Sequence, residues 1–191
     1  KTYSYNEEGL CSSYKLFTGN IQQINIGYTY DEAGRIENVS DNNTVAVTYS
    51  YDANGNLASE TRGNGICVNY TYNSANQPLS VTNQIGNTIL SAYEYTYGLD
   101  GNIVEKADLT GNNTYYVYNP QGMLSSESMY NDNVLKYQTT YSYDNRGNRI
   151  SMSSIGENVY SHEYTYDLNN RLTDEHKLIY NENEESPLML D

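Results

Sequence analysis

Two stretches decide the fold, and they read Tyr28-Thr29-Tyr30-Asp31-Glu32-Ala33-Gly34-Arg35-Ile36 and Tyr49-Ser50-Tyr51-Asp52-Ala53-Asn54-Gly55-Asn56-Leu57. In each stretch a pair of tyrosines alternates with a small polar residue, as in a strand with one covered face. An aspartate follows, and three residues after it a glycine, which is the residue choice of a type I turn closed by a left-handed residue. An apolar residue then begins a second alternating segment. Each stretch therefore predicts a β-hairpin.

The Tyr-x-Tyr pair recurs along the chain, and such a recurrence decides the architecture before any local feature does. It occurs eight times, at Tyr3/Tyr5, Tyr28/Tyr30, Tyr49/Tyr51, Tyr70/Tyr72, Tyr95/Tyr97, Tyr116/Tyr118, Tyr141/Tyr143 and Tyr164/Tyr166. Successive second tyrosines are 25, 21, 21, 25, 21, 25 and 23 residues apart, so the spacings differ only by even numbers. One residue added to each of two paired strands keeps every side chain on its own face, so we expect the length differences to lie in the strands.

The turn residues recur with the tyrosines. The residue after each pair is Asp or Asn in seven repeats and Gly in one: Asn6, Asp31, Asp52, Asn73, Gly98, Asn119, Asp144 and Asp167. Three residues further on, the chain has only Gly or Asn: Gly9, Gly34, Gly55, Asn76, Gly101, Gly122, Gly147 and Asn170. This pattern predicts a three-residue hairpin loop with positive φ at the fourth position of every repeat.

The segments between these turns alternate as strands do. The residues expected on one face are Val45, Val47, Tyr49 and Tyr51; Ile24, Ile26, Tyr28 and Tyr30; and Leu135, Tyr137, Thr139, Tyr141 and Tyr143. The return strands begin with Ile36, Leu57, Leu79, Ile103, Leu124, Ile150 and Leu172. Because Leu79 and Ile150 come one residue late, we expect a bulge in their two turns. A second set of turns is expected at Gly63-Asn64-Gly65, Gly86-Asn87, Gly111-Asn112-Asn113, Asn131-Asp132-Asn133 and Gly156-Glu157-Asn158.

The predicted fold is all-β: an antiparallel meander of about sixteen strands built from eight hairpins. At ~4.8 Å per strand, sixteen strands make a ribbon roughly 75 Å wide, and we expect such a strip to curl as part of a β-shell or solenoid. Residues 1–175 form the predicted array. A further repeat is due near residue 187 and is missing, so residues 176–191 are predicted to be an acidic C-terminal tail where the array ends.

The motif Tyr-x-Tyr-Asp-x-x-Gly-Arg-Ile, present eight times in variant form, resembles the YD repeat of the Rhs family. That family includes bacterial polymorphic toxins, insecticidal toxin-complex subunits and teneurins. The resemblance implies a β-sheet coiled into a hollow shell, which in the bacterial members encloses a toxic polypeptide and in teneurins serves adhesion. Self-cleaving family toxins carry an Asp-Pro-x-Gly motif, but this chain has no Asp-Pro pair, so neither that activity nor a toxin domain is carried over.

Composition and charge limit the classes of partner that the chain is expected to bind. The formal net charge is −14, from 24 acidic and 10 basic side chains, so nucleic acid and anionic lipid are repelled. No run of 18 apolar residues predicts a membrane span, and the start of the chain inside a repeat is interpreted as a cut from a longer protein. Unpaired edge strands are expected to be covered by the rest of the parent polypeptide or to self-associate.

The acidic, histidine and cysteine residues are the candidates for metal binding, catalysis or disulfide formation. The turn aspartates Asp31, Asp52, Asp144 and Asp167 are interpreted as turn caps and not as a calcium ladder, because Asn fills the same position in three repeats. His162 and His176 lack a nucleophile or metal partners nearby, so they are expected to be packing or surface residues. Cys11 and Cys67 lie about five strands apart, roughly 24 Å at ~4.8 Å per strand, and are predicted to be free thiols. No metal, cofactor or catalytic site is predicted.

The function predicted is a non-catalytic segment of a secreted or surface bacterial Rhs/YD-repeat protein that encloses or presents another polypeptide such as a toxin domain. The tyrosines also suit an adhesive module that binds glycan or protein, with exposed residues such as Tyr115 and Tyr130 as candidates. A hydrolase with active residues on the loops is a third alternative. The sequence leaves the first two open, because one hairpin array can build a container or an adhesive surface.

Overall fold

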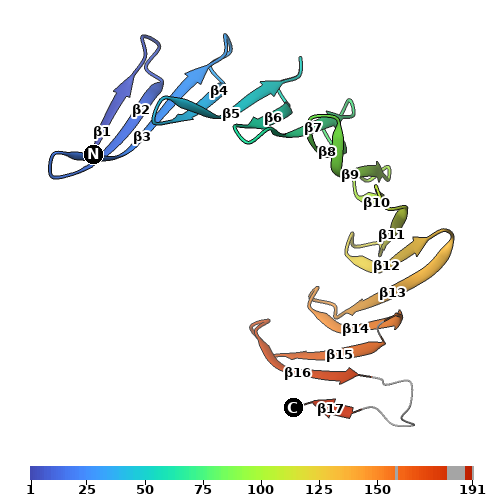
Figure 1. Cartoon of the computed structure of the whole chain (residues 1–191). Coiled ribbons are helices and arrows are strands. Elements are labelled where there is room, and N and C mark those ends of the chain that lie inside the picture. The colour runs from blue at the N-terminus through green and yellow to red at the C-terminus, as the bar shows by residue number, and fades with distance from the viewer. Residues whose placement is uncertain (158, 180–187, 191) are drawn as a thin grey trace. The chain divides into compact units, whose positions relative to one another are not determined.

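The structure, a computed structural model, describes residues 1–157, 159–179 and 188–190. It divides into two compact units, Lys1–Tyr93 and Glu94–Asp191, and the division falls inside strand β9. The strands of the first unit (Figure 1) are β1 (Thr2–Tyr5), β2 (Cys11–Thr18), β3 (Ile21–Tyr30), β4 (Ile36–Asp41), β5 (Thr44–Tyr51), β6 (Leu57–Arg62), β7 (Ile66–Tyr72), β8 (Pro78–Ile85) and the start of β9 (Thr88–Tyr97). Those of the second are the end of β9, β10 (Ile103–Asp108), β11 (Asn112–Tyr118), β12 (Leu124–Asn131), β13 (Val134–Tyr143), β14 (Arg149–Gly156), β15 (Tyr160–Tyr166), β16 (Leu172–Ile179) and β17 (Leu188–Leu190).

Within each unit consecutive strands pair antiparallel, from β1 with β2 to β7 with β8 and from β10 with β11 to β16 with β17. The predicted all-β antiparallel meander of about sixteen strands is therefore confirmed, with β17 as a short addition. The array was expected to end at residue 175, whereas β16 continues to Ile179 and pairs with β17. Residues 180–187 and 191 of the predicted tail lie outside the described residues.

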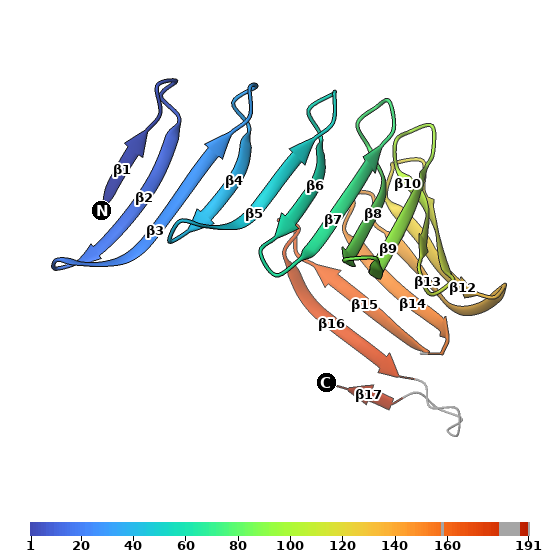
Figure 2. The same cartoon turned by 45° about the horizontal axis from the view of Figure 1, so that its top comes forward.

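The predicted hairpin turns form in all eight repeats. The fourth turn residue has positive φ each time: Gly9 81°, Gly34 75°, Gly55 88°, Asn76 60°, Gly101 83°, Gly122 78°, Gly147 86° and Asn170 60°. In the turn at Asp52, the Asp52 N–H donates to Asn56 O at 2.9 Å and the Gly55 N–H donates to Asp52 O at 3.0 Å, so three residues form the loop. Figure 2 shows these turns along one edge of the first unit, after β1, β3, β5 and β7.

The even spacing of the repeats is explained by strand length. The three 25-residue intervals contain an 8-residue strand followed by a 10-residue strand: β2 and β3, β8 and β9, and β12 and β13. The 21-residue intervals contain a 6-residue strand followed by one of 7 or 8 residues: β4 and β5, β6 and β7, and β10 and β11. The turn that follows each tyrosine pair has the same length in every repeat, and only the strands lengthen. This is expected, because adding residues to both paired strands keeps each side chain on its own face of the sheet.

The expected extra bulge at Leu79 and Ile150 is wrong. Pro78 lies opposite Tyr72, and Arg149 lies opposite Tyr143, as Leu57 lies opposite Tyr51. Pro78 and Arg149 thus occupy the first position of their return strands, and their turns have the same length as the others. Their side chains replace the usual apolar residue there.

Two of the expected faces are also interrupted. Val45 lies opposite Ser40 while Val47 lies opposite Val39, because Ala46 forms a bulge in β5. Since Val39 and Ser40 are neighbours on opposite faces, Val45 leaves the face of Val47. The same shift at Lys136 separates Leu135 from Tyr137.

The second set of turns is only partly as predicted. The predicted turn at Asp132 and Asn133 (φ 50° and 62°) has two residues with positive φ, the type I′ geometry, and a turn of the same geometry that was not predicted lies at Asn42 and Asn43 (φ 49° and 65°). The Gly86 turn forms as predicted, with φ 55°.

Two further turns of this set differ from the prediction or extend beyond the described residues. The turn placed at Gly111-Asn112-Asn113 lies two residues earlier, because Asp108 begins it and Asn112 and Asn113 belong to β11. Asn158, the last residue of the predicted Gly156 turn, lies outside the described residues.

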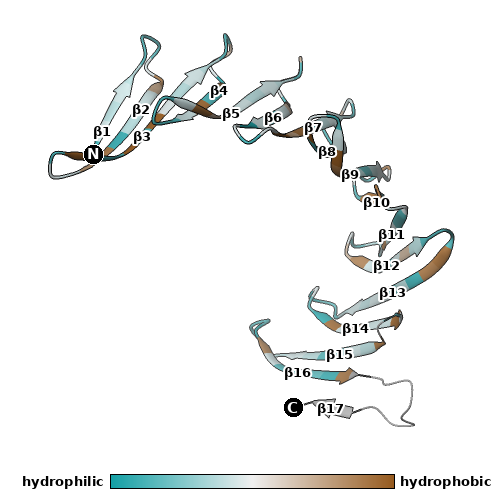
Figure 3. Ribbon diagram, in the orientation of Figure 1, coloured by the Kyte–Doolittle hydropathy of each residue, from teal (hydrophilic) through white to brown (hydrophobic). Residues whose placement is uncertain are grey.

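The face that carries the Tyr-x-Tyr side chains, here called the tyrosine face, is the better covered one. Hydrophobic residues form short patches along the strands, separated by hydrophilic turns (Figure 3). Of the described residues, the buried ones on the tyrosine face are Val68, Thr114, Thr139, Ser154 and Tyr164, and the buried ones on the opposite face are Asn25 and Ser128. The packing layer is therefore made of tyrosine rings over small residues. In the described part of the chain, no helix has the length and apolar character needed to span a membrane.

Candidate functional site

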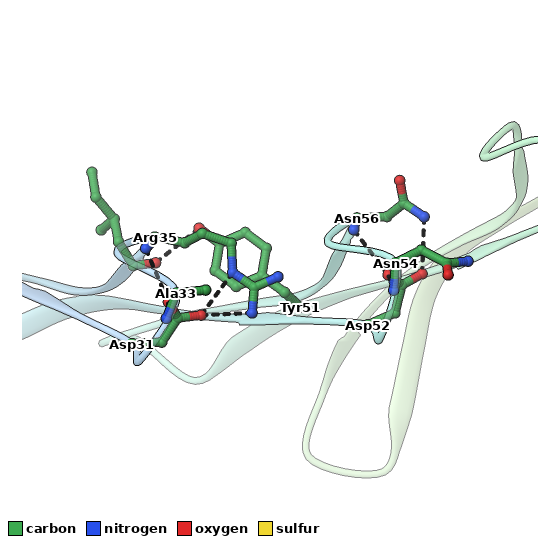
Figure 4. Close-up of polar contacts among 8 residues, drawn as sticks. Asp31, Ala33, Arg35, Tyr51, Asp52, Asn54 and Asn56 are labelled. Atoms are coloured by element: carbon green, nitrogen blue, oxygen red, sulfur yellow. Dashed lines mark hydrogen bonds and ion pairs between the residues drawn. The ribbon is translucent and has the colours of Figure 1, made fainter.

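The repeated unit of the chain is a turn closed by its own first side chain. Asp31 Oδ1 accepts hydrogen bonds from the backbone N–H groups of Ala33 at 3.0 Å and Arg35 at 2.9 Å (Figure 4). Its Oδ2 accepts one from Arg35 Nε at 2.7 Å. These bonds, the one from the Arg35 side chain most of all, hold the pKa of the Asp31 carboxyl below its usual value. Asp52 repeats the arrangement with Asn54 and Asn56, and its pKa is lowered mainly by the Asn56 amide.

The same side-chain cap is present in every repeat that begins with Asp or Asn. The caps besides Asp31 and Asp52 are Asn6, Asn73, Asn119, Asp144 and Asp167. Their oxygens accept from the backbone two and four residues on, so the interpretation of these residues as turn caps agrees with the geometry.

Gly98, the exception, is compensated two residues later. Asp100 Oδ1 accepts from the Asn102 N–H at 3.2 Å, and Oδ2 accepts from Asn102 Nδ2 at 2.8 Å. A Cβ built on Gly98 would lie 2.8 Å from Asp100 Oδ1. The Asp100 carboxylate therefore occupies the place that the side chain of residue 98 fills elsewhere.

A ninth turn of this kind lies at the opposite ends of the strands. Asp108 Oδ1 accepts from the N–H groups of Thr110 at 2.8 Å and Asn112 at 3.1 Å and from the Thr110 hydroxyl at 2.7 Å, and Oδ2 accepts from Asn112 Nδ2 at 2.9 Å. These bonds, led by that of the Thr110 hydroxyl, lower the pKa of Asp108 to about 2. This cap was not predicted from the sequence. Its signal was the similarity of Asp108-Leu-Thr-Gly-Asn112 to Asp52-Ala-Asn-Gly-Asn56.

The second tyrosine of six of the eight pairs makes a contact that was not predicted from the sequence. Its hydroxyl donates to a backbone carbonyl at the start of the preceding return strand, a contact called here the inter-hairpin tyrosine bond. The bonds are Tyr30 to Cys11 (2.6 Å), Tyr51 to Ile36 (2.8 Å), Tyr72 to Leu57 (2.9 Å), Tyr118 to Ile103 (2.9 Å), Tyr143 to Leu124 (2.8 Å) and Tyr166 to Arg149 (3.0 Å). Each one joins a hairpin to its predecessor within a unit.

The sequence separation of these bonds follows the repeat length. Donor and acceptor are 15 residues apart in 21-residue intervals, 19 apart in 25-residue intervals and 17 apart in the 23-residue interval. The same structural position is thus reached each time. The composition contained a signal for this hydrogen bond, since the chain has 23 Tyr and one Phe. If only an aromatic ring were needed for packing, Phe would serve as well as Tyr.

In three places the residue that ends a loop also contacts the next hairpin. The Arg35 guanidinium lies over the Tyr51 ring, 4.3 Å from its centroid. Asn56 Nδ2 donates to Asn76 Oδ1 at 2.8 Å, and Asn148 Nδ2 donates to Asn170 Oδ1 at 3.0 Å. Adjacent hairpins are therefore linked at their turns as well as through their strands.

The acidic and histidine residues considered as metal ligands or catalytic groups contact the backbone of turns or neighbouring side chains. No group of three or more His, Cys, Asp and Glu side chains in the described residues is placed to hold a metal ion. His162 Nδ1 lies 2.9 Å from Glu175 Oε1, and its ring stacks on Tyr164 with centroids 5.9 Å apart. His176 Nε2 lies 3.0 Å from Asp174 Oδ2. Both histidines thus contact carboxylates of β16.

The two cysteines lie on opposite faces of the first unit. Cys11 lies opposite Tyr5 and therefore belongs to the tyrosine face. Cys67 is the neighbour of Val68, which is on the tyrosine face, and so points the other way. Both thiols are free and half-buried.

Tyr115 and Tyr130, the tyrosines considered for glycan binding, contact each other on the face opposite the tyrosine pairs. Their rings meet edge to face with centroids 5.9 Å apart. Tyr115 is 43% exposed, and its hydrogen bond to Glu105 raises its pKa. The pair is packed as cross-strand neighbours are, although one ring remains accessible.

Comparison with known proteins gives one family and one fold. The family model of the teneurin YD-shell matches residues 2–105. The crystal structure of TcdB2-TccC3 without its hypervariable C-terminal region is similar to this chain with a TM-score of 0.73 and 18% identity, over 90% of this chain and 10% of that one. The crystal structure of TcdB2-TccC3-Cdc42 gives a TM-score of 0.71 and 18% identity over 89% of this chain. The chain thus spans about a tenth of the length of these proteins. No curated protein sequence matches it.

Proposed function

This chain belongs to the teneurin YD-shell family, and from that membership we propose that it is a wall segment of a Rhs-type shell. The segment is non-catalytic and part of a longer secreted or surface-displayed bacterial protein. That protein encloses or presents another polypeptide, such as a toxin domain. The hairpins that begin within residues 1–175 supply the wall, and the array ends within residues 176–191, after β16 has paired with β17.

The observation that carries the proposal is the repeated inter-hairpin tyrosine bond. A globular domain closes on a central core, but here only a few of the described residues are buried, and six hairpins are each bonded to their predecessor by a tyrosine hydroxyl. A repeat stabilised by contacts with its neighbours can be extended to any length, which is what a wall requires. The turn caps stabilise the individual hairpins of that wall, and the tyrosine hydroxyls join neighbouring hairpins.

The two native cysteines provide a test. In a closed shell one face of the sheet is shielded, so a thiol on that face is protected from a bulky reagent. Cys11 and Cys67 report on the two faces, and both are half-buried in the chain itself. The native parent protein is treated with a maleimide carrying a large polyethylene glycol, and the isolated 191-residue chain is the reference.

The expected result is that one cysteine of the parent is modified at least tenfold more slowly than in the isolated chain, while the other keeps its rate. An open adhesive surface would leave both thiols reactive at their reference rates. That outcome would refute the shell proposal.

A further inference from the structure

Three hairpins place a glutamate on the tyrosine face directly opposite the first tyrosine of the pair. The pairs are Tyr49 with Glu60, Tyr116 with Glu127, and Tyr164 with Glu175. Two of these carboxylates have a cationic or ionisable partner in the chain. Glu60 accepts from Arg62 Nε at 2.7 Å, and Glu175 lies 2.9 Å from His162 Nδ1. Glu127 has no hydrogen-bond or ion-pair partner among the residues that the structure describes.

The surroundings of Glu127 are aromatic. The side chain is half-buried and lies between Tyr116 on β11 and Thr139 on β13. Thr139 is only 3% exposed, and its strand neighbours on the same face are Tyr137 and Tyr141. Burial raises the pKa of all three tyrosines, that of Tyr141 to about 12, and the Glu127 charge adds to the rise in each. A half-buried carboxylate therefore stands among three rings that cannot neutralise it.

A cation is already bound in this way close by. The Arg149 guanidinium lies 4.9 Å from the centroid of the Tyr164 ring and 5.9 Å from that of Tyr141. Its Nη2 donates to the Tyr164 hydroxyl at 3.4 Å. Rings of the tyrosine face thus accept a guanidinium through cation–π contact, and one of them, Tyr141, also borders Glu127.

We propose that the tyrosine face lines the interior of the shell and that Glu127, bordered by Tyr116, Tyr137 and Tyr141, binds a lysine or arginine side chain of the enclosed polypeptide there. This inference rests on the proposed function and names the chemistry of the enclosed partner. The carboxylate takes the positive charge, and the rings cover the aliphatic stem and the cationic head. The net charge of −14 attracts a basic segment to the wall before that contact forms.

The test measures how the chain binds a defined cationic peptide, N-acetyl-tetralysine amide, by NMR titration at low salt. Glu127→Gln removes the unpaired charge and keeps the shape of the side chain. Glu60→Gln is the matched control, because Glu60 occupies the same position in its hairpin, is also half-buried and is already paired with Arg62. Both variants lose one negative charge, so the long-range attraction falls equally.

The expected result is a dissociation constant about tenfold higher in Glu127→Gln, the size of one lost charge-assisted hydrogen bond. In Glu60→Gln the dissociation constant should stay within about twofold of its original value. In the unsubstituted chain the chemical-shift changes should centre on Tyr116, Tyr137 and Tyr141. Equal weakening in the two variants, or no binding of the peptide by the unsubstituted 191-residue chain, would overturn the inference. Circular dichroism of each variant verifies folding. Failure here leaves the cysteine-accessibility result, which tests the shell itself, unaffected.

Discussion

Removal of one inter-hairpin tyrosine bond, by Tyr51→Phe, tests how the repeats are held together. The Tyr51 hydroxyl donates to Ile36 O at 2.8 Å from a half-buried ring. The substitution keeps the ring under the Arg35 guanidinium and removes only this donor. A net intramolecular hydrogen bond contributes about 0.5–1.5 kcal/mol, and the carbonyl of Ile36 loses a partner, so we expect a loss of about 1 kcal/mol in the free energy of unfolding.

The assay is urea unfolding followed by circular dichroism, with Tyr49→Phe as the matched control. Tyr49 is the other member of the pair, lies on the same face and is also half-buried. No hydroxyl hydrogen bond is found for it among the described residues. The control should change stability by less than ~0.5 kcal/mol. If Tyr51→Phe and Tyr49→Phe had equal effects, the hydroxyl bond would not be what joins the hairpins.

Three further predictions concern the turns. Gly55 has φ of 88°, so Gly55→Val should lower the free energy of unfolding by about 1–2 kcal/mol. Gly55→Asn should lower it little, because Asn76 occupies the equivalent position at φ 60°. Equal melting temperatures of the two variants would contradict the turn geometry. Gly98→Asp should destabilise the chain, because its Cβ would lie 2.8 Å from Asp100 Oδ1 and its carboxylate would compete with that of Asp100 for one place. Adding Asp100→Ala, which empties that place, should restore stability in urea unfolding; a double variant no better than the single one would refute the compensation. The pKa of Asp108 is lower in the folded chain (about 2) than its ordinary value of 3.8, so its contribution to stability is complete above 3.8 and is lost as the pH falls towards 2. Asp108→Asn should therefore flatten the dependence of unfolding free energy on pH in that window, and an unchanged slope would contradict the assigned bonds.

The sequence was sufficient to predict the features that depend on local chemistry. Asp31 and Gly34 have the residue types that a capped type I turn with a left-handed fourth position needs, and the structure has that turn. Even spacing of the Tyr-x-Tyr pairs predicted that length changes lie in paired strands, which the 8- and 10-residue strands of the long intervals show.

Features that depend on the neighbouring hairpin were missed. The acceptor of the Tyr51 hydroxyl is 15 residues upstream, and only the register of β4 against β5 places it under the ring. The bulge at Ala46 likewise arises from pairing and not from composition. Asp100 could replace a cap at Gly98 only because the loop brings its carboxylate back to Asn102. The first two arise from pairing between strands and the third from the path of one loop, and a linear residue pattern contains neither.

The central claim, that the array is the wall of a shell around another polypeptide, is tested most directly by electron microscopy of the full-length parent protein. The expected image is a hollow particle with density inside it and with the strands of this segment in its wall. A solid rod or an extended fibre without an interior would contradict it.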